Sequence, residues 1–114
     1  MNTRISYLYR DGDNYKQSHE VVVSGELTLE QIQPFLLDGE NFIASQVGLQ
    51  DIQTMWKELG FEFPTDQDHV FCEMEDMEFT EEKPTSELTA SQLLFNFQKV
   101  DDWNILETME KLGL

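Results

Sequence analysis

The fold rests on residues 3–10, TRISYLYR, in which β-branched and aromatic side chains largely alternate with polar ones. Ile5, Tyr7 and Tyr9 share one parity, and this spacing of two is typical of a half-buried strand. Residues 11–14, Asp-Gly-Asp-Asn, predict a turn because short polar side chains and glycine tolerate positive φ. Residues 16–24 contain three consecutive valines and are expected to return antiparallel to the first run. The two runs together predict a β-hairpin.

Four helices are expected further along the chain. Thr28 and Gln31 form a capping box that begins the first, in which Pro34 predicts a kink or a one-turn start, and Gly39 follows as a left-handed cap. The best-patterned helix covers residues 52–60, where apolar residues recur at helical spacing: Ile52, Met55, Trp56 and Leu59. The third helix begins with a capping box of Thr89 and Gln92. The fourth is capped by Asp101 or Asp102 and ends at Gly113, and its apolar face consists of Ile105, Leu106, Met109 and Leu112.

Two further strands are expected, a short one over residues 40–46 and a longer one over residues 69–80. In the longer strand the apolar parity changes between Met74 and Met77, so we predict a β-bulge or a break at Glu75-Asp76. The element order is then β-β-α-β-α-β-α-α. This order indicates a single α+β domain over residues 1–114, with helices packed on one face of a small, mostly antiparallel sheet.

Charge is the unusual property of the composition. The chain of 114 residues has 7 basic and 23 acidic side chains, for a net charge of −16. Residues 58–114 hold three of the basic and fifteen of the acidic side chains. This balance argues against direct binding of nucleic acid or of anionic membranes through a basic face. No apolar run exceeds three residues, so we expect no membrane-spanning helix and no signal peptide, and a cytoplasmic location.

The sequence contains no strong catalytic or metal-binding motif. The Asp11-Gly-Asp-Asn14 turn fails the calcium-loop pattern at its fifth, sixth and twelfth positions. Cys72 shares a parity with Val70 and Met74 and is expected to be a core thiol, whereas His69 would point to the other face. Cysteine and histidine show no zinc-ligand spacing. We therefore expect no catalytic residue, no cofactor and no metal ligand.

The densest acidic run lies on the predicted strand at residues 69–80 and supplies the candidate partner-binding residues: Glu73, Glu75, Asp76 and Glu78. They favour a non-enzymatic protein that binds a protein partner, of basic character, through an acidic surface. One alternative is a nucleic-acid mimic that inhibits a nucleic-acid-binding protein. Carboxylates on one strand face repeat at about 6.6–6.8 Å, which is broadly similar to the spacing of successive phosphates along a DNA strand. Others are an immunity or antitoxin protein and, last, a small enzyme using carboxylates and a metal. The oligomeric state is left open.

Two segments also suggest a resemblance. Residues 7–16, YLYRDGDNYK, followed by residues 37–42, LDGENF, resemble a type of small acidic bacterial protein, hypothetical and of unknown function, with a YLYRDxxNYK-like hairpin and an LDGExF-like segment. The resemblance covers roughly the first half of the chain. It implies a bacterial origin and one compact domain, and it brings no assigned activity.

Overall fold

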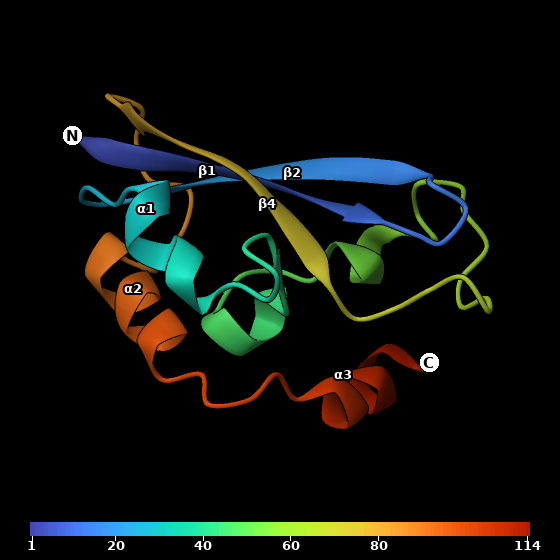
Figure 1. The fold of residues 1–114 in the computed structure, drawn as a ribbon. Helices are drawn as coiled ribbons and strands as arrows, with labels where there is room; N and C mark the ends of the chain where they lie inside the picture. Colours follow the sequence, from blue (N-terminus) through green and yellow to red (C-terminus); the bar gives the residue numbers. More distant parts are fainter.

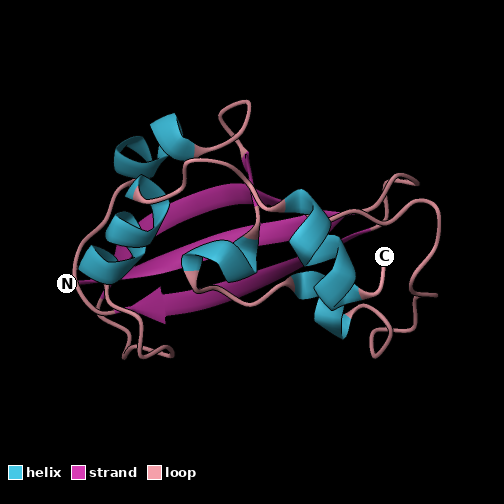
Figure 2. Ribbon diagram, turned by 90° about the horizontal axis from the view of Figure 1, so that it is seen from below, coloured by secondary structure: helices cyan, strands magenta, loops and turns pink.

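The computed structural model describes residues 1–114 and contains one four-stranded antiparallel sheet in the order β2-β1-β4-β3. The strands are β1 (Asn2–Arg10), β2 (Lys16–Val23), β3 (Asn41–Phe42) and β4 (Cys72–Thr80). The helices are α1 (Leu29–Ile32), α2 (Ala90–Gln98) and α3 (Ile105–Leu112), with 3₁₀ turns η1 (Gln33–Phe35), η2 (Ala44–Val47) and η3 (Ile52–Met55). The helices lie on one side of the sheet (Figures 1 and 2), which confirms the α+β class expected from the sequence.

The predicted hairpin is confirmed. β1 and β2 pair in unbroken register from Thr3 opposite Val23 to Arg10 opposite Lys16. In the connecting turn, the Asp11 carboxylate accepts hydrogen bonds of 3.0 Å from the backbone N–H groups of Asp13 and Tyr15. These bonds satisfy the Asp11 side chain within the turn itself.

The predicted bulge is also present, and it decides what each face of the sheet carries. Ser6 pairs with Asp76 while the next residue, Tyr7, pairs with Met74, so Glu75 is the extra residue in β4. The extra residue restores the parity of the strand. Met77 stands opposite the core residue Ile5 in the same register, on the face that Met74 shares with Tyr7. The acidic residues of β4 are thereby left on the other face.

The core lies between the covered face of the sheet and the helices and turns beneath it. Ile5, Tyr7 and Tyr9 of β1 are buried there against side chains from the rest of the chain, including Trp56 and Phe97. Trp56 stacks on Phe61 with ring centroids 4.1 Å apart and meets Tyr9 edge-on at 4.8 Å. Burial of aromatic rings supplies much of the hydrophobic stabilisation in a core of this size.

The prediction of an α-helix over residues 52–60 is wrong. Only η3 forms, closed by 3₁₀-type bonds such as the one from the Trp56 N–H to the Gln53 carbonyl. The chain then reverses at Gly60, whose φ is +94°, so that Phe61 can stack on Trp56. The segment thus ends at Gly60, where the sequence predicted a helix end, but it is a 3₁₀ turn followed by hydrogen-bonded turns rather than an α-helix.

The short strand expected over residues 40–46 is reduced to β3. The Asp51 carboxylate accepts a hydrogen bond from the Ser45 N–H at 3.1 Å, and this bond fits the turn η2 rather than an extended chain. β4 likewise begins at Cys72 rather than at residue 69. The interruption expected at Pro34 is confirmed as a one-turn start, since α1 ends at Ile32 and the 3₁₀ turn η1 follows.

The two C-terminal helices differ in how they pack. The capping box of Thr89 with Gln92 is confirmed at the start of α2. α3 begins after Asn104, not after Asp101 or Asp102, and Gly113 ends it with a φ of +78°. The expected apolar face of α3 is only partly buried: Ile105 and Leu106 are exposed, Leu106 by 82%, Met109 and Leu112 are half-buried, and Thr108 is the buried residue of this helix.

Candidate functional site

The candidate site is the face of the sheet that the helices leave uncovered, here called the open face (Figure 1). The strands contribute these polar or charged residues to it: Asn2, Arg4, Ser6 and Arg10 of β1, Lys16, Ser18 and Glu20 of β2, and Glu73, Glu75, Asp76, Glu78 and Thr80 of β4. All four candidate partner-binding residues therefore lie on one face. If residues 73–76 formed a regular strand with no bulge, alternation would place Glu73 and Asp76 on opposite faces.

Two of the four carboxylates are paired with arginines of β1. The Arg10 Nε donates to the Glu73 Oε2 at 3.0 Å, and the Arg4 Nη1 donates to the Glu78 Oε2 at 3.1 Å. The side chain of Glu73 is about one-quarter exposed, at 26%, and that of Glu78 is more than half exposed, at 58%. Ion pairs between partly exposed side chains contribute under about 1 kcal/mol each to the free energy of folding, so their main effect is to hold the side chains in place.

The other two carboxylates have no cationic partner. Glu75 accepts a hydrogen bond of 2.8 Å from the Ser18 hydroxyl, and Asp76 accepts one of 2.9 Å from the N–H of Met77. Both side chains belong to exposed residues. The uncompensated negative charge of these four candidates is therefore concentrated at the bulge.

Sequence reasoning missed two carboxylates near this face. Glu20 of β2 stands opposite Ser6, which donates a weak bond of 3.4 Å to it, and the parity of β2 contained this signal. Glu82 follows β4 and pairs with Arg4. This pairing lowers the pKa of Glu82 and raises that of Arg4, through their hydrogen bond and mutual charge. Nothing in the sequence indicated that the chain after β4 would turn back onto β1.

Not every acidic residue of the second half gathers here. Asp101, Asp102, Glu107 and Glu110 lie on or before α3, on the opposite side of the molecule from the open face (Figure 1). Asp68 is half-buried and accepts the Tyr9 hydroxyl at 2.6 Å. The concentration of charge on one face is thus a property of β4 and its neighbours rather than of the whole second half.

The two side chains considered for catalysis are both engaged in the fold. Cys72 is fully buried, and this burial raises the pKa of its thiol to about 12, so that the thiol is protonated at neutral pH. The Nδ1 atom of His69 accepts a hydrogen bond of 3.1 Å from the Phe71 N–H. The ring hydrogen is therefore on Nε2, which donates to the Arg10 carbonyl at 2.7 Å. No group of three or more His, Cys, Asp or Glu side chains is placed to hold a metal ion.

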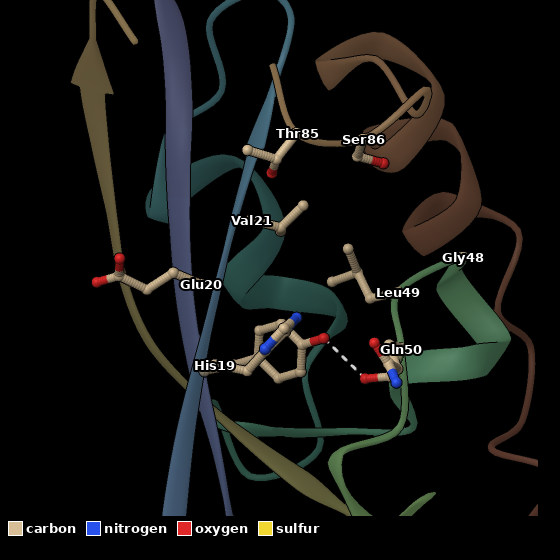
Figure 3. A pocket seen from close by; sticks show the side chains of 9 residues that line it. His19, Glu20, Val21, Gly48, Leu49, Gln50, Thr85 and Ser86 are labelled. Atoms are coloured by element: carbon tan, nitrogen blue, oxygen red, sulfur yellow. Dashed lines mark hydrogen bonds between the residues drawn. The ribbon is translucent and has the colours of Figure 1, made fainter. Parts of the chain in front are cut away.

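One depression lies at the outer edge of β2, on the covered side of the sheet (Figure 3). Its volume is about 490 Å³. His19 and Val21 point into it from β2, Leu49 faces them across it, and Glu20 points away toward the open face (Figure 3). The Tyr7 hydroxyl at its base already donates to the Gln50 carbonyl at 2.7 Å. The depression is bounded above by Thr85 and Ser86.

No protein-family model, curated protein or solved structure matches this chain significantly. A functional conclusion must therefore come from the geometry of the site. None of the helices has the length and apolar character needed to cross a lipid bilayer.

Proposed function

We propose that this protein is a non-enzymatic, cytoplasmic binding protein that takes a basic protein partner on the open face of its sheet. The observation that supports the proposal most is the bulge at Glu75. It brings Glu73, Glu75, Asp76 and Glu78 to one uncovered surface. A bulge next to a functional surface is a common device for re-aiming side chains.

The distribution of charge supports a partner with several lysines or arginines. Glu75 and Asp76 are exposed and meet no cation of the chain, so a partner cation would gain an interaction there without displacing an existing one. The net charge of −16 adds a long-range field that speeds encounter with a basic protein. Arg4 and Arg10 hold the flanking carboxylates in fixed positions, and this order favours a specific contact over a diffuse one.

The state of the reactive side chains supports binding over catalysis. The Cys72 thiol is buried and protonated, and both ring nitrogens of His69 are used within the fold. A general base or nucleophile needs to reach a substrate in its active protonation state. Neither residue meets that requirement in this arrangement.

The proposal is tested by pull-downs from the native host with the wild-type protein and two double variants. Glu75→Gln with Asp76→Asn removes the two unpaired charges. Asp101→Asn with Glu110→Gln removes the same charge near α3 and serves as the matched control. We expect a basic protein that is retained at 50 mM salt and lost at 500 mM, with retention at least tenfold weaker for the first variant only. Equal retention by both variants, or at both salt concentrations, would overturn the proposal.

A further inference from the structure

The outer edge of β2 is only partly covered by the rest of the chain. At Val22, the N–H donates to the Thr85 hydroxyl at 2.9 Å and the carbonyl accepts the Thr85 N–H at 2.8 Å. Both backbone groups of Val22 therefore point away from β1. In an antiparallel ladder this direction alternates, so the backbone groups of Glu20 and Ser18 point the same way. The cover ends at Val22, and the edge continues beyond it as far as Lys16.

Glu20 and Ser18 form no backbone hydrogen bonds on this edge. The N–H and carbonyl of Glu20 and the N–H of Ser18 have no partner within the chain. The Ser18 carbonyl accepts only the side-chain amide of Gln17, at 3.0 Å. Residues 16–20 of β2 thus present about 17 Å of strand edge, which is enough for an extended segment of about five residues.

The depression described above borders this same edge on the covered side. A strand added beside β2 would direct alternate side chains toward Val21 and Leu49 in the depression, where an aliphatic side chain fits (Figure 3). Its remaining side chains would lie on the open face beside Glu20 and near Ser18, whose hydroxyl holds Glu75. The two sides of the edge therefore favour different residues in the added strand.

From these features we propose that an extended segment of the basic partner, with alternating basic and aliphatic residues, adds to β2 as a fifth strand. Main-chain hydrogen bonds to Glu20 and Ser18 give affinity, and the two sides of the edge give specificity. This inference rests on the proposed function for the basic character of the partner. A second copy of this chain fits less well, because each copy brings a charge of −16 and its own Glu20 to the seam.

The probe is an acetylated and amidated heptapeptide of alternating lysine and valine. Two forms with methylated backbone nitrogens serve as matched tests. In one form the backbone N-methyl groups are on two inner lysines, and in the other they are on two inner valines. In an antiparallel addition, residues opposite Glu20 share its face and direct their N–H groups to β2, so lysine methylation blocks the edge and valine methylation does not. We expect at least a fivefold difference in Kd between the two methylated peptides. If valine methylation is the damaging one, the strand adds in parallel; equal affinities would overturn the inference.

Variants of Glu20 give a second readout. Glu20→Pro removes only the outward N–H, since the pairing of Glu20 with β1 does not use it, and an edge strand tolerates such a proline. Glu20→Gln removes the charge and keeps the N–H. We expect Glu20→Pro to weaken heptapeptide binding at least fivefold more than Glu20→Gln. Equal weakening would contradict strand addition.

The site of binding separates this inference from the proposed function. Peptide-induced amide shifts in NMR spectra are expected at Ser18, Glu20 and Leu49. Shifts confined to Glu75 and Asp76 would support the open face and overturn strand addition. Conversely, a difference between the methylated peptides together with unaltered partner binding by the Glu75→Gln, Asp76→Asn variant would support the edge and overturn the open face. Dimers that Glu20→Pro converts to monomers would show that a second copy occupies the edge, which also overturns the inference.

Discussion

The Tyr9 hydroxyl donates a hydrogen bond of 2.6 Å to the Asp68 carboxylate and also accepts the His69 N–H at 3.2 Å. These two bonds fasten the centre of the sheet to the loop that precedes β4. Asp68 in turn accepts the Thr65 N–H at 2.9 Å, so one carboxylate organises the loop and anchors it. The arrangement gives a half-buried acid a structural role.

Replacement of Tyr9 by Phe removes both bonds while keeping the ring against Trp56. The change leaves the His69 N–H without its partner and the half-buried Asp68 carboxylate with only its bonds from Thr65, at a cost of roughly 1–3 kcal/mol. We expect a lower midpoint in urea unfolding with an unchanged slope. Tyr15→Phe, at an exposed ring, is the matched control and should leave the midpoint unchanged. Equal midpoints for both variants would contradict the anchoring role.

Alkaline pH is expected to unfold the protein through its two buried tyrosines. Burial raises the pKa of Tyr7 and of Tyr9 above the ordinary value of 10. The stability associated with these raised values is fully present below pH 10 and is lost as pH rises further, because the unfolded chain releases these protons first. Thermal melts from pH 8 to 12 should show a fall in Tm that begins near pH 10. A Tyr7→Phe, Tyr9→Phe variant should show a shallower fall.

Deletion of Glu75 should be tolerated. Without it, Met74 and Asp76 follow each other in regular alternation, and every core residue of β4 keeps its face. Deletion of Glu73 is the control: it also removes one glutamate, but it turns Cys72 out of the core. We expect cooperative unfolding for the first deletion and its loss for the second, measured by near-UV circular dichroism. A folded Glu73 deletion would contradict the role assigned to the register.

Cys72 should resist alkylation in the folded protein. Its thiol is fully buried and its pKa is raised to about 12, so thiolate is scarce and inaccessible at pH 8. Iodoacetamide labelling followed by mass spectrometry should be at least a hundredfold slower in buffer than in 6 M guanidinium chloride. Rapid labelling in buffer would contradict the burial of the thiol.

The hairpin and the bulge were predictable because strand alternation is a local property. Tyr7 and Tyr9 fix one face of β1, and the change of parity between Met74 and Met77 is visible in the sequence. The capping boxes at Thr28 and Thr89 are equally local. The four candidate carboxylates came from the same strand, so their shared face followed once the bulge was placed.

The errors arose where distant contacts override local pattern. The helical spacing around Trp56 is real and the end at Gly60 was predicted, but residues Ile52–Met55 form a 3₁₀ turn instead of an α-helix, and Trp56 stacks on Phe61. The pairing of Arg4 with Glu82 joins residues far apart in sequence. The open edge of β2 depends on where Thr85 stops covering it, which no property of residues 16–20 reveals.

The sparse packing of α3 has a consequence for how the protein opens. Gln46 is one of its attachments: the Gln46 amide donates to the Asp102 carbonyl at 2.8 Å and accepts the Asn104 N–H at 2.9 Å. No apolar residue of the helix is fully buried, since Met109 and Leu112 are only half-buried, so the hydrophobic resistance to its release is small. Amide protons of the last ten residues should then exchange with solvent through local detachment of α3, and they should do so much faster than the amide protons of the sheet.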